Sequence, residues 1–297
     1  MFRTRLISGI MLVILAALGI IAGGWIWAGM LCFISVNAYL ELTRATPVHT
    51  EGKALNALEI TGMVLIVCYY LPFFLTDLIL EILGGKDFLQ VLFKLTILII
   101  AAYCMILALL VFMVVYVCKF PGYKAGQVMA AYFEFIYAPV LLSFLYMIRE
   151  TWNSGAYLMG LVFLCSWGSD TCAYCVGVLF GKHKMTPKLS PKKSIEGAIG
   201  GIVGSALLCG LYTHYVLNVY AKDEFAITVA GAVLLGVIGA FISMIGDLVA
   251  SAIKRDYDIK DYGKLIPGHG GIMDRFDSVI IVAPLIFFYV YTVDVLL

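Results

Sequence analysis

Charged residues are scarce in this chain. Asp, Glu, Lys and Arg make up 13% of its 297 residues, against roughly 25% in an ordinary soluble domain. Hydrophobic residues make up 63%, and no polar stretch is long enough to form a soluble domain with its own core. A helix satisfies its backbone hydrogen bonds internally, so long apolar runs can cross lipid as helices. The composition therefore predicts an all-α polytopic integral membrane protein.

The sequence also lacks a disulfide framework, a complete zinc motif and an internal repeat. Its eight cysteines fall almost entirely inside apolar runs, which predicts reduced, buried thiols. Cys172-Ala-Tyr-Cys175 has CxxC spacing, but no second CxxC or nearby histidine pair completes a metal or redox site. Without inverted repeats, an ion-coupled transporter using Asp170 and Asp247 is disfavoured.

Apolar runs long enough to cross about 30 Å of hydrocarbon predict about nine transmembrane helices. Leu71-Pro72 interrupts the third run, so residues 73–83 are a candidate re-entrant or interfacial piece. The predicted spans lie near residues 5–22, 24–42, 55–75, 89–118, 127–148, 156–181, 196–219, 226–252 and 278–296.

The basic residues predict the orientation of these spans. With nine spans, most of the 20 lysines and arginines fall on the side that carries the N-terminus. The positive-inside rule then places the N-terminus and both charged loops in the cytoplasm. Residues 1–150 are mostly plain apolar runs, which suggests a lipid-facing or dimer-forming region. Residues 151–297 hold nearly all the polar and glycine-rich motifs, which predicts the catalytic region.

The first charged loop, residues 181–197, contains Ser190-Pro-Lys-Lys-Ser194 immediately before a predicted helix. Backbone N–H groups at a helix start bind phosphate, particularly beside lysines and a hydroxyl. Lys192, Lys193 and Ser194 are therefore candidate phosphate ligands. The alternative is a solvated basic loop that only obeys the positive-inside rule.

The second charged loop, residues 251–277, gathers cations, acids and glycines in one short stretch. Asp274 and Asp277 are three residues apart at the predicted start of the last helix, where they would share a face and one metal ion. Asp247 lies just upstream. Mg²⁺ prefers carboxylates and substrate phosphates as ligands. Alternatively, the two acids cap the last helix while Asp247 pairs with Lys254 or Arg255. Two roles are possible for Asp170: it either lines the site or is a buried structural acid.

This second loop resembles the signature of phosphatidate cytidylyltransferases, also called CDP-diacylglycerol synthases. The resemblance covers roughly residues 150–297. It rests on Ser251, Lys254-Arg255, Lys260-Asp261, Gly263, Pro267, His269-Gly-Gly271, Asp274-Arg275 and Asp277, and upstream on Ser169-Asp170, Gly181-Lys182 and Ser190 to Gly197. It implies that CTP and phosphatidic acid react to give CDP-diacylglycerol and pyrophosphate.

The resemblance also implies roles for the candidate residues. Asp247 and Asp274, assisted by Asp277 or Asp170, would hold Mg²⁺, and whether a monovalent cation accompanies it stays open. His269 would either donate to the leaving pyrophosphate or order the glycine loop. Gly270 and Gly271 would bind substrate phosphate, because glycines let the backbone approach a phosphate closely. The residues expected to hold phosphates are Lys192, Lys193, Lys254, Arg255, Lys264 and Arg275.

The expected partners are CTP, phosphatidic acid and the lipid bilayer, with no nucleic acid, and the resemblance alone suggests a homodimer. The expected location is the cell membrane, with the active site at the cytoplasmic face. A CTP-dependent lipid kinase or an ether-lipid cytidylyltransferase is the alternative enzyme.

Overall fold

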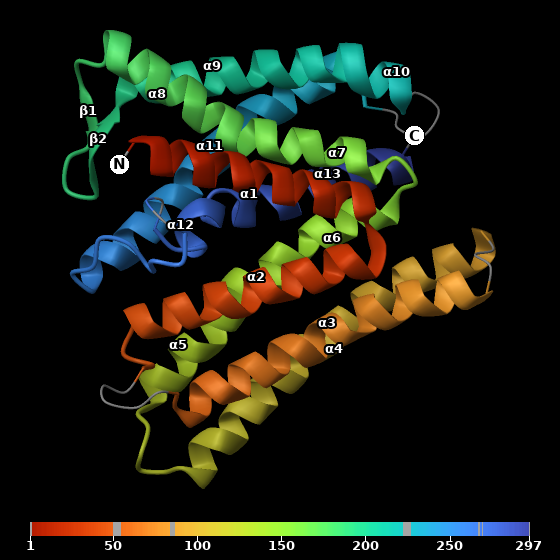
Figure 1. Cartoon of the computed structure of the whole chain (residues 1–297), viewed down its shortest axis with the longest axis vertical. Coiled ribbons are helices and arrows are strands. Elements are labelled where there is room, and N and C mark those ends of the chain that lie inside the picture. The colour runs from red at the N-terminus through yellow and green to blue at the C-terminus, as the bar shows by residue number, and fades with distance from the viewer. Residues whose placement is uncertain are drawn as a thin grey trace. The chain divides into compact units, whose positions relative to one another are not determined.

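The computed structural model describes residues 2–49, 55–83, 87–221, 227–266, 268 and 270–296, and these are almost entirely helical (Figure 1). Within them, strand structure is limited to one short antiparallel pair, β1 (Lys184–Thr186) and β2 (Ser190–Ser194). The predicted all-α membrane fold is confirmed. Seven helices in this part of the chain are long and apolar enough to cross a membrane, and two shorter apolar helices cover Ser8–Ala22 and Val279–Asp294. The count of about nine spans and the cytoplasmic N-terminus stay predictions.

The chain forms two compact units. The first comprises Met1–Tyr146 with Asp261–Met273, and the second comprises Met147–Lys260 with Asp274–Leu297. The division of roles predicted for residues 1–150 and 151–297 stays a prediction. The first unit contains α1 (Phe2–Ala22), α2 (Gly24–Ala45), α3 (Ala57–Leu83), α4 (Asp87–Cys118), α5 (Ala125–Phe135), the π-helical segment η1 (Ile136–Val140) and the first part of α6 (Leu141–Thr151).

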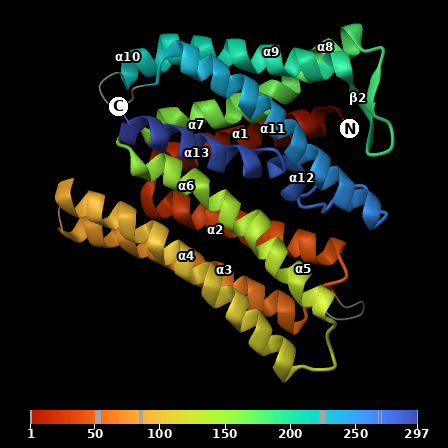
Figure 2. The ribbon, with the colours of Figure 1, turned by 180° about the vertical axis from the view of Figure 1, so that it is seen from behind.

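Aromatic side chains form the core of the first unit. Tyr69, Phe73 and Tyr146 are almost fully buried, and their rings pack against one another around α3. Two buried polar atoms of this core are hydrogen-bonded, as most buried polar groups are: the Tyr69 hydroxyl lies 2.9 Å from Ser143 Oγ, and Trp27 Nε1 donates to the Leu145 carbonyl over 3.3 Å. In Figures 1 and 2, α3 and α4 run side by side as a long pair.

The predicted break at Leu71-Pro72 is wrong, because α3 continues through Pro72 to Leu83. Proline removes one backbone donor, but membrane helices tolerate it where neighbouring groups compensate. The turn after Pro72 is held in place: Thr76 Oγ1 donates to the Pro72 carbonyl over 2.7 Å, and Phe73 is only 1% exposed. Packing of the following turn therefore keeps the helix continuous, and residues 73–83 do not form a separate piece.

The second unit contains most of the residues predicted to bind substrate or metal. Its helices α8 and α9 lie side by side in Figure 1, and the β1–β2 hairpin connects them. The remaining elements of the unit are α7 (Gly155–Phe163), the π-helical segment η2 (Leu164–Gly168), α8 (Ser169–Phe180), α9 (Ile195–Tyr212), the π-helical segment η3 (Thr213–Leu217), α10 (Asn218–Tyr220), α11 (Val229–Asp256), α12 (Met273–Phe276, whose first residue belongs to the first unit) and α13 (Val279–Leu296).

Small residues allow α8 and α9 to approach closely. A Cβ atom added at Gly201 would lie 3.0 Å from both Ala173 Cβ and the Ser169 carbonyl oxygen, and one added at Gly197 would lie 2.8 Å from the Ala173 carbonyl oxygen. Gly197 and Gly201 thus form a small-xxx-small stripe, which is how membrane helices pack tightly without a hydrophobic driving force between them. This close packing sets the position of the hairpin relative to α8.

The stripe predicts a large effect of substituting Gly201. Gly201→Leu is expected to destabilise the second unit by about 1–3 kcal/mol, because overpacking forces the two helices apart. The measurement is the unfolding temperature in detergent. Gly29→Leu, at a helical glycine where an added Cβ meets nothing within 4 Å, is the matched control. Equal unfolding temperatures for the two variants would contradict the close-packing role.

The cysteines form no disulfide within the described residues. All eight are free. Cys165 and Cys209 are buried as expected, but Cys68, Cys118 and Cys175 are exposed on the helices, which corrects the expectation that nearly all are buried. Apolar helix faces that meet lipid carry exposed thiols at little cost.

Candidate functional site

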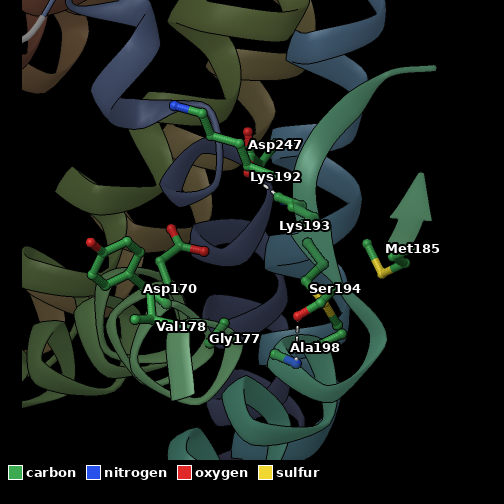
Figure 3. A pocket seen from close by; sticks show the side chains of 13 residues that line it. Asp170, Gly177, Val178, Met185, Lys192, Lys193, Ser194, Ala198 and Asp247 are labelled. Atoms are coloured by element: carbon green, nitrogen blue, oxygen red, sulfur yellow. Dashed lines mark hydrogen bonds and ion pairs between the residues drawn. The ribbon is translucent and has the colours of Figure 1, made fainter. Parts of the chain in front are cut away.

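A pocket of about 390 Å³ lies within the second unit, between α8, the hairpin, the start of α9 and α11 (Figure 3). The α8 residues repeat at helical spacing and therefore share one face. The hairpin and α9 close the opposite wall. The lining residues are Asp170, Ala173, Tyr174, Gly177 and Val178 of α8, Met185, Lys192, Lys193 and Ser194 of the hairpin, Gly197 and Ala198 of α9, and Met244 and Asp247 of α11.

The hairpin is held at the start of α9 by hydrogen bonds. Ser194 is the N-cap of α9, and its hydroxyl accepts from the Gly197 N–H over 3.1 Å, as N-cap serines do. The Glu196 carboxylate accepts from the backbone N–H groups of Lys182 and His183, and lies 2.6 Å from His183 Nδ1. The predicted phosphate cradle is therefore a capped helix start with Lys192 and Lys193 beside it. The Ser194 hydroxyl already serves the cap.

Lys193 and Asp247 form an ion pair inside the pocket, drawn as a dashed line in Figure 3. Both side chains are about one-quarter exposed. The alternative that pairs Asp247 with Lys254 or Arg255 is therefore replaced by a pair that joins α11 to the hairpin. Lys193 comes from the first charged loop, and Asp247 lies in α11 just upstream of the second.

Asp170 lies close enough to Asp247 for the two carboxylates to repel each other, and it is attracted by Lys193 and Arg275. The π-helical segment η2 directly precedes α8 and its Asp170; such segments often mark functional sites. Within η2, Trp167 Nε1 donates to the Arg275 carbonyl over 3.2 Å. Asp170 therefore lines the pocket and belongs to a charged cluster with Asp247, Lys193 and Arg275.

Asp277 is a third carboxylate in this cluster. It is 8% exposed, and its own carboxylate accepts from the Ser278 N–H over 2.8 Å. A Cβ added at Gly246 would meet the Asp277 carbonyl oxygen at 2.7 Å, so this turn lies against α11 beside Asp247. Burial, followed by the charge of Asp247, raises the pKa of Asp277 to about 7. A bound cation would reverse this effect by favouring the charged carboxylate.

Asp274 forms an ion pair with a lysine of α11. The predicted shared helix face for Asp274 and Asp277 is wrong: α12 ends at Phe276 and Asp277 lies in the following turn. The Asp274 carboxylate accepts from Lys254 Nζ over 2.8 Å, and these side chains are only 3% and 14% exposed. Lys254 is seven residues, or about two helical turns, beyond Asp247 on α11. The structure thus groups Asp277, Asp247 and Asp170, with Asp274 held by Lys254.

The remaining predicted residues divide between the two units. In the second unit, Arg255 Nε donates to the Leu189 carbonyl of the hairpin over 3.4 Å. Arg275 Nε is buried and has no hydrogen-bond acceptor among the described residues, although its charge acts on Asp170. Lys264, which is exposed, belongs to the first unit, as do the half-buried Gly270 and the buried Gly271. His269 lies outside the described residues.

The described residues contain no group of three or more carboxylate, histidine or cysteine side chains placed to hold a metal ion by themselves. The donor chemistry nevertheless fits Mg²⁺. Asp170, Asp247 and Asp277 supply only oxygen ligands and lie within one another's electrostatic field. Mg²⁺ is usually held by one or two carboxylates together with substrate phosphates rather than by an all-protein cage. A site that is completed by the nucleotide needs no third protein ligand.

Comparison with known proteins decides the family. Residues 3–293 match the sequence profile described as the cytidylyltransferase family. The chain belongs to the cytidylyltransferase family.

Relatives of this cytidylyltransferase-family chain include proteins named phosphatidate cytidylyltransferase. The protein of Staphylococcus saprophyticus subsp. saprophyticus is 37% identical over 149 residues, which is 50% of this chain and 54% of the relative. That of Haemophilus influenzae is 39% identical over 139 residues, 47% of each chain. That of Mycobacterium bovis is 38% identical over 160 residues, 54% of this chain and 49% of the relative. The chain spans about half the length of the curated relatives it matches.

The cytidylyltransferase-family site contains residues that the sequence analysis did not single out. Tyr174 and Val178 follow Asp170 at intervals of four along α8, a spacing that could have identified them as pocket residues. They are 73% and 66% exposed, so the charged pocket borders an apolar helix face. Outside this pocket, in the first unit, Glu41 was not singled out either, although ionisable residues inside apolar helices often have a function.

Proposed function

We propose that this chain is a phosphatidate cytidylyltransferase, which converts CTP and phosphatidic acid to CDP-diacylglycerol and pyrophosphate. The observation that carries the proposal is the charged cluster beside the pocket of a cytidylyltransferase-family chain. Within the second unit, Asp170, Asp247 and Asp277 interact with Lys193, Lys254 and Arg275. Closely spaced acids and cations are what a polyphosphate carried with a divalent metal requires.

The proposed reaction is an attack of a lipid phosphate oxygen on the α-phosphorus of CTP. The new P–O bond forms as the bond between the α-phosphorus and the oxygen bridging to the β-phosphate breaks, and pyrophosphate leaves with that electron pair. Phosphatidic acid is already an anion near neutral pH, so no strong general base is needed. Such transfers depend mainly on positioning and charge stabilisation.

The basic residues are proposed to hold the phosphates of the two substrates. Lys193 would release Asp247 and contact phosphate, and Lys192 lines the same pocket. Arg275, whose Nε has no acceptor among the described residues, would contribute a further phosphate contact. Mg²⁺, when bound by Asp247 with Asp277 or Asp170, would neutralise negative charge on the triphosphate. Asp274 would keep Lys254 in place beside this cluster.

The apolar border of the pocket suits a lipid substrate. Tyr174 and Val178 are largely exposed on α8, within a helix long and apolar enough to cross the membrane. A phosphatidic acid molecule would keep its acyl chains against this face while its head group reaches Lys193. We propose that this site opens at the cytoplasmic face of the cell membrane, where CTP is available. The homodimer suggested by the resemblance stays a prediction.

Turnover by the purified protein tests the proposed function. The protein in detergent is incubated with labelled CTP, Mg²⁺ and phosphatidic acid, and the lipid extract is searched for a labelled liponucleotide. Label transferred to CDP-diacylglycerol supports the proposal. Production of CDP with a phosphorylated lipid would identify a CTP-dependent kinase instead. GTP and dATP in parallel reactions test base selectivity.

Lys193→Ala is expected to raise the KM for at least one substrate by about 10-fold or more, because a charged hydrogen bond to phosphate is worth about 1.5–3 kcal/mol. The measurement is steady-state kinetics with CTP and phosphatidic acid varied separately. Lys188→Ala, at an exposed lysine of the same hairpin connection, is the control. Unchanged KM values for both substrates would count against a phosphate-binding role for Lys193.

A further inference from the structure

In the first unit, the described residues 261–266, 268 and 270–273 belong to a turn that leads directly into Asp274. Ile266 and Gly270 exchange backbone hydrogen bonds of 2.9 and 3.2 Å. Gly270 has a φ of 94°, a left-handed conformation that favours glycine. Tyr262, Ile266 and Ile272 are all less than 9% exposed. The described part of the turn therefore packs into its unit through these three buried side chains.

The carboxylate of Glu41 holds the end of this turn. Glu41 lies in α2 and is 8% exposed. Its Oε1 accepts from the Ile272 N–H over 3.0 Å, and its Oε2 accepts from the Met273 N–H over 2.9 Å. A buried carboxylate is costly unless its oxygens are hydrogen-bonded, and charge-assisted hydrogen bonds are stronger than neutral ones. Both oxygens thus bind the backbone immediately before Asp274.

Two glycines make room for this carboxylate. A Cβ atom added at Gly263 or at Gly271 would overlap the carboxylate of Glu41. The early and late parts of the turn therefore close around the same side chain. Because apolar burial already keeps the turn against its unit, the specific contribution of Glu41 is to fix the backbone register at Ile272 and Met273.

We propose that Glu41 is a positioning residue for the cytidylyl transfer. Its carboxylate sets the point at which the chain enters Asp274-Arg275 and thereby orients the residues that follow, up to Asp277. A supporting residue of this kind acts through others, and small displacements of reacting groups are costly in rate. The inference rests on the proposed function, because the positioned residues belong to its charged cluster.

Glu41→Gln is the test, because it keeps the size of the side chain but replaces one accepting oxygen with an NH₂ group that faces a backbone N–H. We expect kcat to fall by about 10- to 100-fold, because catalytic groups that are displaced from their productive positions react more slowly. The KM for CTP should change by less than about threefold. Backbone amide hydrogen exchange provides the second readout. The peptide containing Ile272 and Met273 should lose protection while peptides from α8 and α9 keep theirs.

Glu134→Gln is the matched control. Glu134 is also in the first unit, is 3% exposed and accepts from Thr46 Oγ1 over 2.7 Å. Its substitution should leave both kcat and the exchange of the 272–273 peptide unchanged. Glu41→Asp, which keeps the charge on a shorter side chain, should retain more kcat than Glu41→Gln, and it replaces that variant if Glu41→Gln does not fold.

Wild-type kcat in Glu41→Gln, or a loss that matches only the fraction of unfolded protein, would overturn the positioning role. An equal loss in Glu134→Gln would do the same. If the wild-type protein makes no liponucleotide, the proposed function fails by itself. The exchange comparison still decides whether Glu41 holds the turn, since unchanged protection at Ile272 and Met273 would overturn the anchor.

Discussion

Asp247→Asn is expected to reduce turnover by about 100- to 1,000-fold, comparable to removing one preorganised electrostatic group from an active site. Asp247 is at the centre of the charged cluster: it pairs with Lys193 and acts electrostatically on both Asp170 and Asp277. The amide keeps the shape but removes the charge that would hold a divalent cation. The measurement is liponucleotide formation by the purified variant.

Two further measurements make this test specific. The Mg²⁺ concentration that gives half-maximal activity should rise in Asp247→Asn, because an amide oxygen is a weaker ligand than a carboxylate. Asp256→Asn, at an exposed position near the end of the same helix α11, should leave turnover and Mg²⁺ dependence unchanged. Turnover of Asp247→Asn near the wild-type value would remove Asp247 from the proposed site.

Asp274→Asn is expected to abolish nearly all turnover and also to destabilise the second unit. Lys254 and Asp274 form a mostly buried ion pair, and removing one partner of such a pair leaves an uncompensated charge that costs about 3–5 kcal/mol. Residual turnover should be below about a tenth of wild type, which corresponds to at least about 1.4 kcal/mol of transition-state stabilisation. Turnover is measured well below the unfolding temperature of the variant.

The double variant Lys254→Met with Asp274→Asn separates stability from catalysis. Removing both charges should restore much of the unfolding temperature, because no buried charge remains unpaired. Turnover should stay low, because Lys254 belongs to the proposed charged cluster and Asp274 keeps it in place. Recovery of turnover together with stability would show that the pair is purely structural, and Asp274 would then have no direct catalytic role.

Much of the fold could be predicted from apolar runs alone. The helical stretches follow the predicted runs closely, as α2 (Gly24–Ala45) does for the predicted span 24–42. The lipid environment makes this possible, because it forces backbone groups to bond within each helix. Pro72 was the exception. Its local rule predicts a break, and the packing of Phe73 against Tyr69 and Tyr146 outweighs that rule.

The candidate site was less predictable than the helices. Spacing along the chain suggested that Asp274 and Asp277 share a helix face, but α12 ends at Phe276. Asp274 accepts from Lys254, whereas Asp277 lies in the following turn, where the charges of both Asp247 and Lys254 act on it. Asp170 could be assigned to the pocket only after α8 was placed against α11. No local pattern could reveal that Glu41 binds the backbone of Ile272 and Met273, which are more than 200 positions further along the chain.

Residue order was enough to predict the membrane-spanning helical class and to locate the two charged loops, because apolar runs and clustered charges are local properties of the chain. Partnerships between charges needed the folded molecule. Which carboxylate meets which cation depends on helix ends and close helix packing, and these follow from contacts between segments that are far apart in the chain. For this protein, the pairing of Lys193 with Asp247 and of Lys254 with Asp274 was decided at that level.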